Sequence, residues 1–203
     1  MSDVCIAIMA GGKSSRMGTD KAFVEILGKP MIEHLLEQIG DVGQESTLII
    51  ANRPDNYAHL GLPIYSDFIP DKGSLGGIYT AIHYSPSLYT FVIACDMPFV
   101  RVDLVRYMIG LCETGGYDVI VPRVDNYPQG LHAIYNRSCL EPIRRKLDAD
   151  RLKVIGFYDD VDVRVRYLEE HEYRRYDPHG HALQNINTPN ELAEARRLAG
   201  EEG

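Results

Sequence analysis

Residues 3–21, DVCIAIMAGGKSSRMGTDK, join a short apolar run to a glycine-rich basic loop. The apolar run at 3–9 ends at glycines, which predicts a buried strand. Glycines allow backbone N–H groups to approach a phosphate closely, and Lys13, Arg16 and Lys21 can neutralise a triphosphate. A pair of glycines alone is typical of an ordinary surface turn. Three cations and three glycines after a buried strand favour a phosphate-binding loop instead.

The loop matches neither of two common phosphate motifs. Gly12, Lys13 and Ser14 imitate the end of a P-loop, but Ala7 stands where that motif needs a glycine. The dinucleotide fingerprint G-x-G-x-x-G is absent from the sequence as well. The sequence therefore predicts a phosphate loop of a different kind.

Outward from this loop, short apolar runs alternate with longer amphipathic segments. Such alternation predicts an α/β fold with a mostly parallel sheet covered on both faces. The loops after Met9, Ser66 and Cys95 should then gather at the carboxyl edge of the sheet, where ligands bind in such folds. The expected strands are 3–9, 46–51, 63–66, 88–95, 117–122, 131–135 and 161–168, and the expected helices are 31–39, 78–84, 102–112, 138–147 and a last one after residue 188.

Size and composition limit the class of protein. The 203 residues suffice for one domain with a full core, so we expect a single domain over 1–203. The net charge of -8 argues against a nucleic-acid partner, which needs a basic surface. No apolar run reaches the length of a membrane span, and the N-terminus does not resemble a signal peptide. We therefore expect a cytoplasmic protein with no membrane partner.

Three further segments carry candidate site residues. Asp96 follows the apolar run 88–95, where a carboxylate could hold a Mg²⁺ ion that meets bound phosphates, although Asp is also a common helix cap. The loop at 67–77 is rich in turn formers, yet a carboxylate there could accept hydrogen bonds from a guanine N1–H and 2-amino group or from a ribose hydroxyl. The amides of residues 185–189 could complete a metal shell, although such residues are also common before a helix.

The motif M-A-G-G-K-S-S-R-M-G-T-D-K at 9–21 resembles the signature of the molybdenum cofactor guanylyltransferases. The resemblance continues, in the right order, through segments 28–30, 51–53, 67–77, 95–98 and 185–189, so it covers nearly the whole chain. It implies a three-layer, Rossmann-like nucleotidyltransferase fold. It also implies transfer of GMP from GTP to molybdopterin with release of pyrophosphate, Mg²⁺ as cofactor, and molybdenum-insertion or molybdoenzyme chaperone proteins as partners.

The resemblance also implies roles for particular residues. Arg16, Lys21 and Asp96 would be catalytic, and Asp96 and Asn187 would hold the metal. Asn185, Asn187 and His132 would lie at the second substrate, although His132 inside an apolar strand also fits a core residue. The residues expected to contact the nucleotide are Met9, Ala10, Gly11, Gly12, Lys21, Asn52, Asp67, Asp71 and Asp96.

Two rival functions stay open at this point. The loop motif alone also fits a cytidylyltransferase of the same fold that acts on a pterin or on a sugar or polyol phosphate. A regulatory or carrier protein that binds a nucleotide without turnover is the second rival.

Overall fold

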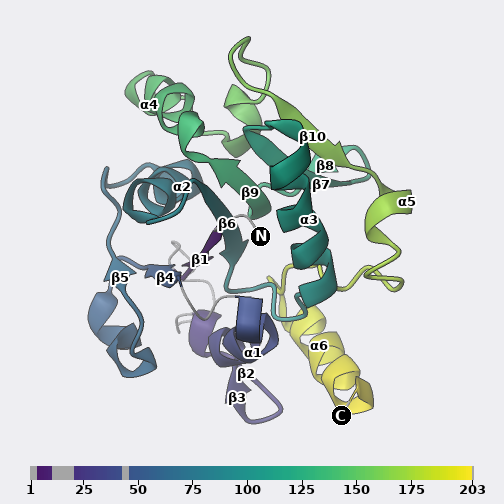
Figure 1. Cartoon of the computed structure of the whole chain (residues 1–203). Coiled ribbons are helices and arrows are strands. Elements are labelled where there is room, and N and C mark those ends of the chain that lie inside the picture. Colours follow the sequence, from purple (N-terminus) through teal and green to yellow (C-terminus); the bar gives the residue numbers. More distant parts are fainter. Residues whose placement is uncertain (1–3, 11–20, 43–45, 203) are drawn as a thin grey trace.

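The computed structural model describes residues 4–10, 21–42 and 46–202. Helices surround a central sheet (Figure 1). The strands are β1 (Val4–Met9), β2 (Glu25–Ile26), β3 (Lys29–Pro30), β4 (Thr47–Ile50), β5 (Ile64–Tyr65), β6 (Tyr89–Ala94), β7 (Val119–Val124), β8 (Tyr127–Pro128), β9 (His132–Asn136) and β10 (Val165–Leu168), and the α-helices are α1 (Met31–Ile39), α2 (Gly73–Tyr84), α3 (Val102–Gly115), α4 (Leu140–Asp148), α5 (Glu170–Tyr173) and α6 (Pro189–Glu202).

The main sheet has eight strands, in the order β10-β7-β9-β6-β1-β4-β5, with β8 paired to β7. β1 lies parallel to both β4 and β6, and β10 lies parallel to β7. Only β9 on the main path runs against its neighbours, β6 and β7. The mostly parallel sheet predicted from the sequence is thus confirmed. The carboxyl ends of β1, β4, β5, β6, β7 and β10 consequently share one edge.

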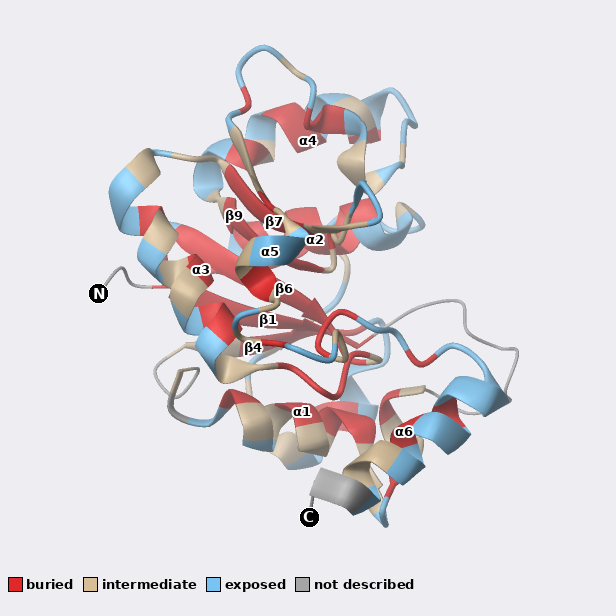
Figure 2. Ribbon diagram, turned by 90° about the vertical axis from the view of Figure 1, so that its right-hand side faces the viewer, coloured by how far each residue is buried: buried red, intermediate tan, exposed pale blue. Residues whose placement is uncertain are grey.

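Helices cover both faces of the sheet because alternate residues of each central strand point to opposite sides. On one side, Ile6 and Ile8 of β1 belong to a core formed with α1 and α3; on the other, Cys5 and Ala7 belong to a core formed with α2 and α4. Figure 2 shows the central strands as buried throughout. A third core, which includes Phe99, attaches α6 and the β2–β3 hairpin.

The loop predicted over 67–77 is shorter than expected, because α2 begins at Gly73 and not at Ile78. Two adjacent glycines disfavour a helix in isolation. Here packing outweighs that preference, since Leu75 is fully buried in the core and Gly77 lets the helix approach β1 closely. A Cβ atom added at Gly77 would lie 2.2 Å from the Cε atom of Met9.

The strand predicted over 161–168 is also shorter, because residues 161–164 lie outside the sheet and β10 begins at Val165. The N–H of Val163 donates to the carbonyl of Asp160 at 3.0 Å, which closes a turn before the strand. Asp160 and Asp162 both form ion pairs with Arg145. The alternation over 161–164 therefore does not mark one face of the sheet: Asp162 pairs with α4, and Arg164 donates to the carbonyl of Gly115. No helix in the described part of the chain is long and apolar enough to cross a membrane.

Candidate active site

The chain leaves β1 at the carboxyl edge of the sheet, between β4 and β6. Ala10 donates its N–H to the carbonyl of Ile50 at 2.9 Å, and Cys95 donates its N–H to the carbonyl of Met9 at 3.1 Å. The buried Tyr57 hydroxyl donates to the carbonyl of Ala10 at 2.8 Å. These bonds extend the sheet by one residue and fix where the glycine-rich loop begins. Met9 and Ala10 are both buried.

Three side chains predicted for the site meet at this edge, and we call them the Lys21 cluster. Lys21 follows the glycine-rich loop, Asp96 follows β6, and Asn187 precedes α6. The ammonium of Lys21 lies 3.4 Å from Oδ2 of Asp96 and donates a hydrogen bond of 2.6 Å to Oδ1 of Asn187. Asp96 and Asn187 lie 75 and 166 residues after Lys21 in the sequence, yet both contact its ammonium.

Within the Lys21 cluster, the carboxylate of Asp96 is only partly compensated. Its side chain is 17% exposed, and its Oδ1 atom is buried with no hydrogen-bond partner among the described residues. Burial raises the pKa of Asp96, and the charge of Lys21 opposes that rise without cancelling it. A buried carboxylate oxygen without a partner is costly, so its presence favours a function that uses it.

The capping residues of α6 hold Asn187 in place. The N–H of Ile186 donates to the backbone carbonyl of Asp96 at 2.9 Å. The carboxylate of Glu191 accepts hydrogen bonds from the N–H groups of Asn187 and Thr188 at 2.6 and 2.8 Å. Thr188 Oγ1 in turn accepts from the N–H of Glu191 at 3.2 Å. Thr188 and Glu191 thus form a capping box, and it presents the Asn187 amide to Lys21.

A second pair of predicted residues meets beyond β4 and β5. Asn52 donates from Nδ2 to Oδ2 of Asp67 at 2.8 Å, and its Oδ1 accepts the N–H of Asp67 at 3.0 Å. The Oδ1 atom of Asp67 would lie 3.6 Å from a Cβ atom added at Gly77. The reciprocal bonds to Asn52 orient the Asp67 carboxylate at the same edge of the sheet as Met9.

Three other predicted residues lie apart from these contacts. Asp71 is exposed and has a φ of 61°, in the left-handed region. Asn185 is exposed and lines a groove of about 280 Å³ beside Phe99 and α6. His132 is fully buried on β9, where the ring of Phe91 packs against it at 5.1 Å, and burial lowers the pKa of His132 to about 3. Gly11, Gly12 and Arg16 lie outside the described residues.

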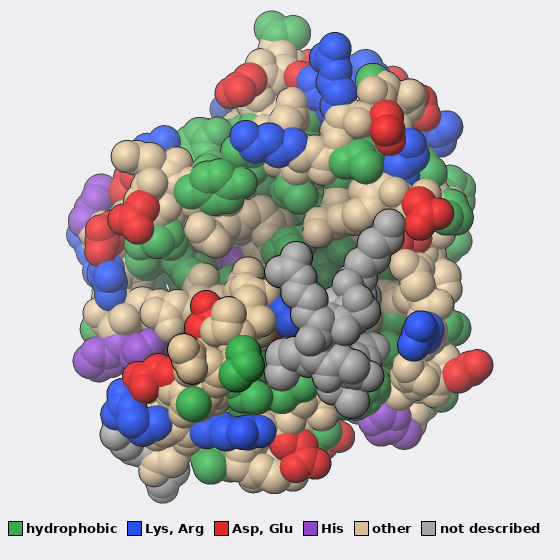
Figure 3. All heavy atoms as spheres, turned by 180° about the vertical axis from the view of Figure 1, so that it is seen from behind, with side chains coloured by type: hydrophobic (Ala, Val, Ile, Leu, Met, Phe, Trp, Pro, Cys, Tyr) green, Lys and Arg blue, Asp and Glu red, His purple; other side chains and the backbone are tan. Residues whose placement is uncertain are grey.

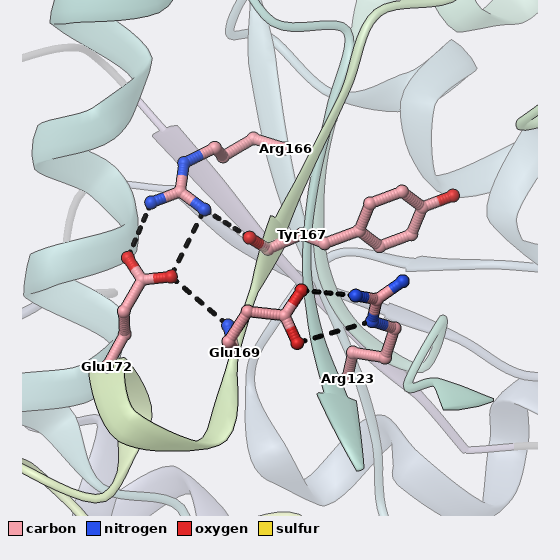
Figure 4. Close-up of polar contacts among 5 residues, drawn as sticks. All are labelled: Arg123, Arg166, Tyr167, Glu169 and Glu172. Carbon is pink, nitrogen blue, oxygen red and sulfur yellow. Dashed lines mark hydrogen bonds and ion pairs between the residues drawn. The ribbon is translucent and has the colours of Figure 1, made fainter. Parts of the chain in front are cut away.

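A different set of charged residues lies where β7 and β10 end, and we call it the Arg–Glu cluster: Arg123, Arg166, Glu169 and Glu172 (Figure 4). Arg123 pairs with Glu169, and Arg166 pairs with Glu172. Burial opposes ionisation of Glu172, but the Arg166 guanidinium and the N–H of Glu169 outweigh it, so the net pKa of Glu172 is lowered. Each carboxylate is therefore compensated, and the cluster ties α5 to two strands.

Charged side chains of both signs are interspersed on the face shown in Figure 3. The contacts of the Lys21 cluster and of Asn52 with Asp67 join single residues, and they do not form a broad basic field. A local cation can bind an anionic small molecule on a protein whose net charge is -8.

The MobA-like NTP transferase domain matches residues 6–161. The chain belongs to this family. It is 38% identical over 192 residues to the "Probable molybdenum cofactor guanylyltransferase" of Pelotomaculum thermopropionicum, which covers 95% of this chain and 91% of that protein. It is 32% identical over 202 residues to the protein of the same name from Natranaerobius thermophilus, with 98% of this chain and 97% of that protein covered.

The fold of this MobA-like chain also has solved relatives. It matches the crystal structure of molybdopterin-guanine dinucleotide biosynthesis protein A from Archaeoglobus fulgidus with a TM-score of 0.83 and 26% identity, over 97% of this chain and 98% of that one. The predicted Rossmann-like nucleotidyltransferase fold and the resemblance to the molybdenum cofactor guanylyltransferases are thereby confirmed. The protein is a nucleotidyltransferase.

Sequence reasoning missed two residues of this region. Tyr57 lies in a short 3₁₀ helix, Pro54–Leu60, and only the fold reveals that its hydroxyl reaches Ala10. Asp177 is fully buried in the segment before Asn185. An Asp three residues before a Gly, as in Asp177–Gly180, is typical of a turn, and this pattern could have drawn attention to Asp177.

Proposed function

We propose that this protein is a molybdenum cofactor guanylyltransferase, which transfers GMP from GTP to the terminal phosphate of molybdopterin and releases pyrophosphate. The observation that carries the proposal is the Lys21 cluster, in which a cation, a buried carboxylate and an amide oxygen meet at the ligand edge of the sheet. Asp67, oriented by Asn52, is the group that we propose for the nucleoside. The names of the relatives support guanylyl transfer in particular.

Mg²⁺ is the metal that we propose for the site. The buried Oδ1 atom of Asp96 has no partner among the described residues, and Oδ1 of Asn187 accepts a hydrogen bond from a cation. Carboxylate and amide oxygens suit Mg²⁺, which binds through one or two carboxylates and takes its remaining ligands from phosphates and water. Asp96 and Asn187 would therefore hold the ion, whose chemistry is to neutralise negative charge on the phosphates.

The residues of the chain then have electrostatic and positioning tasks. An oxygen of the molybdopterin phosphate forms a bond to the α-phosphorus of GTP, and the bond from that phosphorus to the bridging oxygen breaks, so that pyrophosphate leaves with the electron pair. The attacking phosphate is an anion at neutral pH, so no strong general base is needed. Lys21 lowers the repulsion between the two polyanions, and the contacts of Asp67 hold the nucleoside in place. We propose that Arg16 assists Lys21.

The direct test is to incubate the purified protein with GTP, Mg²⁺ and molybdopterin and to identify the product by mass. We expect molybdopterin guanine dinucleotide and an equal amount of pyrophosphate. The same reaction with CTP, ATP and UTP should give little product. Preference for CTP would contradict the proposal and favour the cytidylyltransferase. Tight GTP binding without pyrophosphate release would favour a carrier protein.

We propose molybdenum-insertion or molybdoenzyme chaperone proteins as recipients of the product, which co-purification from cells that make molybdoenzymes would test. We also propose a cytoplasmic location, because GTP is a cytoplasmic substrate. Recovery of the protein with washed membranes would contradict that location.

A further inference from the structure

The segment between β10 and α6 carries Asn187 to the Lys21 cluster. Apart from the four-residue helix α5, it contains no regular helix or strand. Ladder hydrogen bonds therefore cannot fix its path, and other contacts must do so. The position of the Asn187 amide relative to Lys21 depends on those contacts.

Asp177 is the centre of those contacts. It is fully buried, and its carboxylate accepts three backbone hydrogen bonds. Oδ1 accepts from the N–H groups of Gly180 and His181 at 3.1 Å each, and Oδ2 accepts from the N–H of Ala182 at 3.0 Å. Gly180 has a φ of 75°, a conformation that suits glycine and turns the chain back over the carboxylate. Bonds from N–H groups to an ionised carboxylate are stronger than neutral ones.

The segment is held on both sides of Asp177. Upstream, the Arg–Glu cluster ties α5 to the ends of β7 and β10 (Figure 4). Downstream, Leu183 and Ile186 are buried, and the N–H of Ile186 bonds to the carbonyl of Asp96. Only four residues separate Ala182 from Asn187. A rearrangement of the turn at 178–182 would therefore be transmitted over a short path to the active site.

We propose that Asp177 is a positioning residue for guanylyl transfer: by binding three backbone N–H groups it sets the path of residues 182–187, and so places the Asn187 amide against Lys21 and Asp96. Asp177 does not touch the reacting groups. The inference rests on the proposed function for its kinetic consequence, but its structural consequence stands independently.

The experiment compares Asp177→Ala with the matched control Asp118→Ala in the full chain. Asp118 is also a carboxylate that accepts hydrogen bonds from a backbone N–H, that of Arg164 at 2.8 Å, and from Ser138, but it lies at the opposite edge of the sheet. Amide hydrogen exchange is measured by mass spectrometry, without ligands, over peptides that cover 178–190. Steady-state kinetics with GTP, Mg²⁺ and molybdopterin follow on the same preparations.

In Asp177→Ala we expect exchange at Leu183, Ile186 and Asn187 to be about tenfold faster or more. We expect kcat to fall about tenfold to a hundredfold, since small displacements at an active site have such effects, while the KM for GTP changes by less than about threefold. Asp177→Asn, which retains an acceptor oxygen but presents an amide N–H₂ toward one of the donors, should fall between wild type and Asp177→Ala. Asp118→Ala should leave exchange over 183–187 and kcat unchanged.

Unchanged exchange over 183–187 in Asp177→Ala would overturn the proposal, as would an equal change in Asp118→Ala or an unchanged kcat. If Asp177→Ala fails to fold, the same criteria apply to Asp177→Asn. If the wild type releases no pyrophosphate from GTP and molybdopterin, the proposed function fails, and the exchange comparison alone then decides the role of Asp177.

Discussion

The Lys21 cluster and the Arg–Glu cluster lie at the same edge of one sheet, yet their charges are compensated differently. In the Arg–Glu cluster each carboxylate has its own guanidinium, and the pKa of Glu172 is lowered. In the Lys21 cluster one ammonium serves both a carboxylate and an amide, an Asp96 oxygen is buried without a partner among the described residues, and burial raises the pKa of Asp96.

This difference separates a structural role from a functional one. A fully paired set of charges fixes geometry, and its removal costs stability. A carboxylate left short of positive charge is unfavourable in the free protein but suits a site that gains cations and phosphates on binding. The two clusters should therefore respond in opposite ways to mutation. Mutation of the Lys21 cluster should abolish activity and leave the fold intact. Mutation of the Arg–Glu cluster should lower stability and leave most of the activity intact.

The largest effect is expected for Asp96→Ala. We expect turnover to fall by about a thousandfold or more, because loss of a preorganised charged group at a reacting phosphate has effects of that order. The melting temperature should not fall, because the variant removes a carboxylate that burial disfavours. Pyrophosphate release and thermal unfolding measure the two effects. Near-normal GTP-dependent pyrophosphate release in the variant would exclude a catalytic role for Asp96.

The next effect is expected for Arg166→Ala, in the Arg–Glu cluster. It leaves Glu172, whose side chain is 14% exposed, without its cation, so the free energy of unfolding should fall by about 2–3 kcal/mol. Urea unfolding measures the loss. At 25 °C, kcat should remain within a few-fold of wild type if the variant is folded. The double variant Arg166→Met with Glu172→Met should recover part of the stability, since no unpaired charge is left. Equal losses in the single and double variants would argue against compensation by pairing.

The sequence predicted most of the Lys21 cluster but not the Arg–Glu cluster. Lys21 ends the loop after the first predicted strand, and Asp96 follows the apolar run 88–95. Parallel strands bring such loops to one edge, so the meeting of Lys21 and Asp96 could be expected. Asn187 could be expected there only as a candidate ligand of the same metal. The Arg–Glu cluster could not, because it depends on β10 pairing with β7 and on where β10 begins. The prediction placed that strand four residues too early, because residues 161–164 continue the alternation but form a turn, in which Asp162 pairs with Arg145 of α4.

A smaller effect concerns His132, which lies on β9 between the two clusters. Its pKa is lowered by burial to about 3, whereas an unfolded chain has a histidine pKa of about 6.5. As the pH falls below 6.5 the unfolded state binds a proton that the folded state does not, so stability decreases. Between pH 7 and pH 5 this residue should cost about 2 kcal/mol. His132→Leu should lose that part of the acid sensitivity in urea unfolding.

His83→Gln is the control for this pH dependence, because His83 is exposed on α2 and should leave most of the acid-induced loss in place. Equal acid sensitivity of wild type and His132→Leu would contradict the buried neutral state of His132. The His132→Leu variant also tests the predicted contact of His132 with the second substrate. A large rise in the KM of this variant for molybdopterin would support that contact, which the complete burial of the ring does not favour.

The smallest effect separates the two nucleoside contacts proposed for Asp67. If its carboxylate accepts from the guanine 2-amino group, the wild type should prefer GTP to ITP in kcat/KM by about tenfold, and Asp67→Asn should lose that preference. If it accepts from a ribose hydroxyl, the wild type should instead prefer GTP to 2′-deoxy-GTP in kcat/KM, and Asp67→Asn should lose that preference.

Two further variants refine this test. Because Asn52 donates to Asp67 at 2.8 Å, Asn52→Ala should weaken the preference that Asp67→Asn abolishes, by freeing the carboxylate to rotate. Asp71→Asn, tested in parallel, shows whether the exposed Asp71 shares the contact. Unchanged selectivity in Asp67→Asn for all three nucleotides would remove Asp67 from nucleoside recognition, and the site would then be defined by the phosphates and the Lys21 cluster alone.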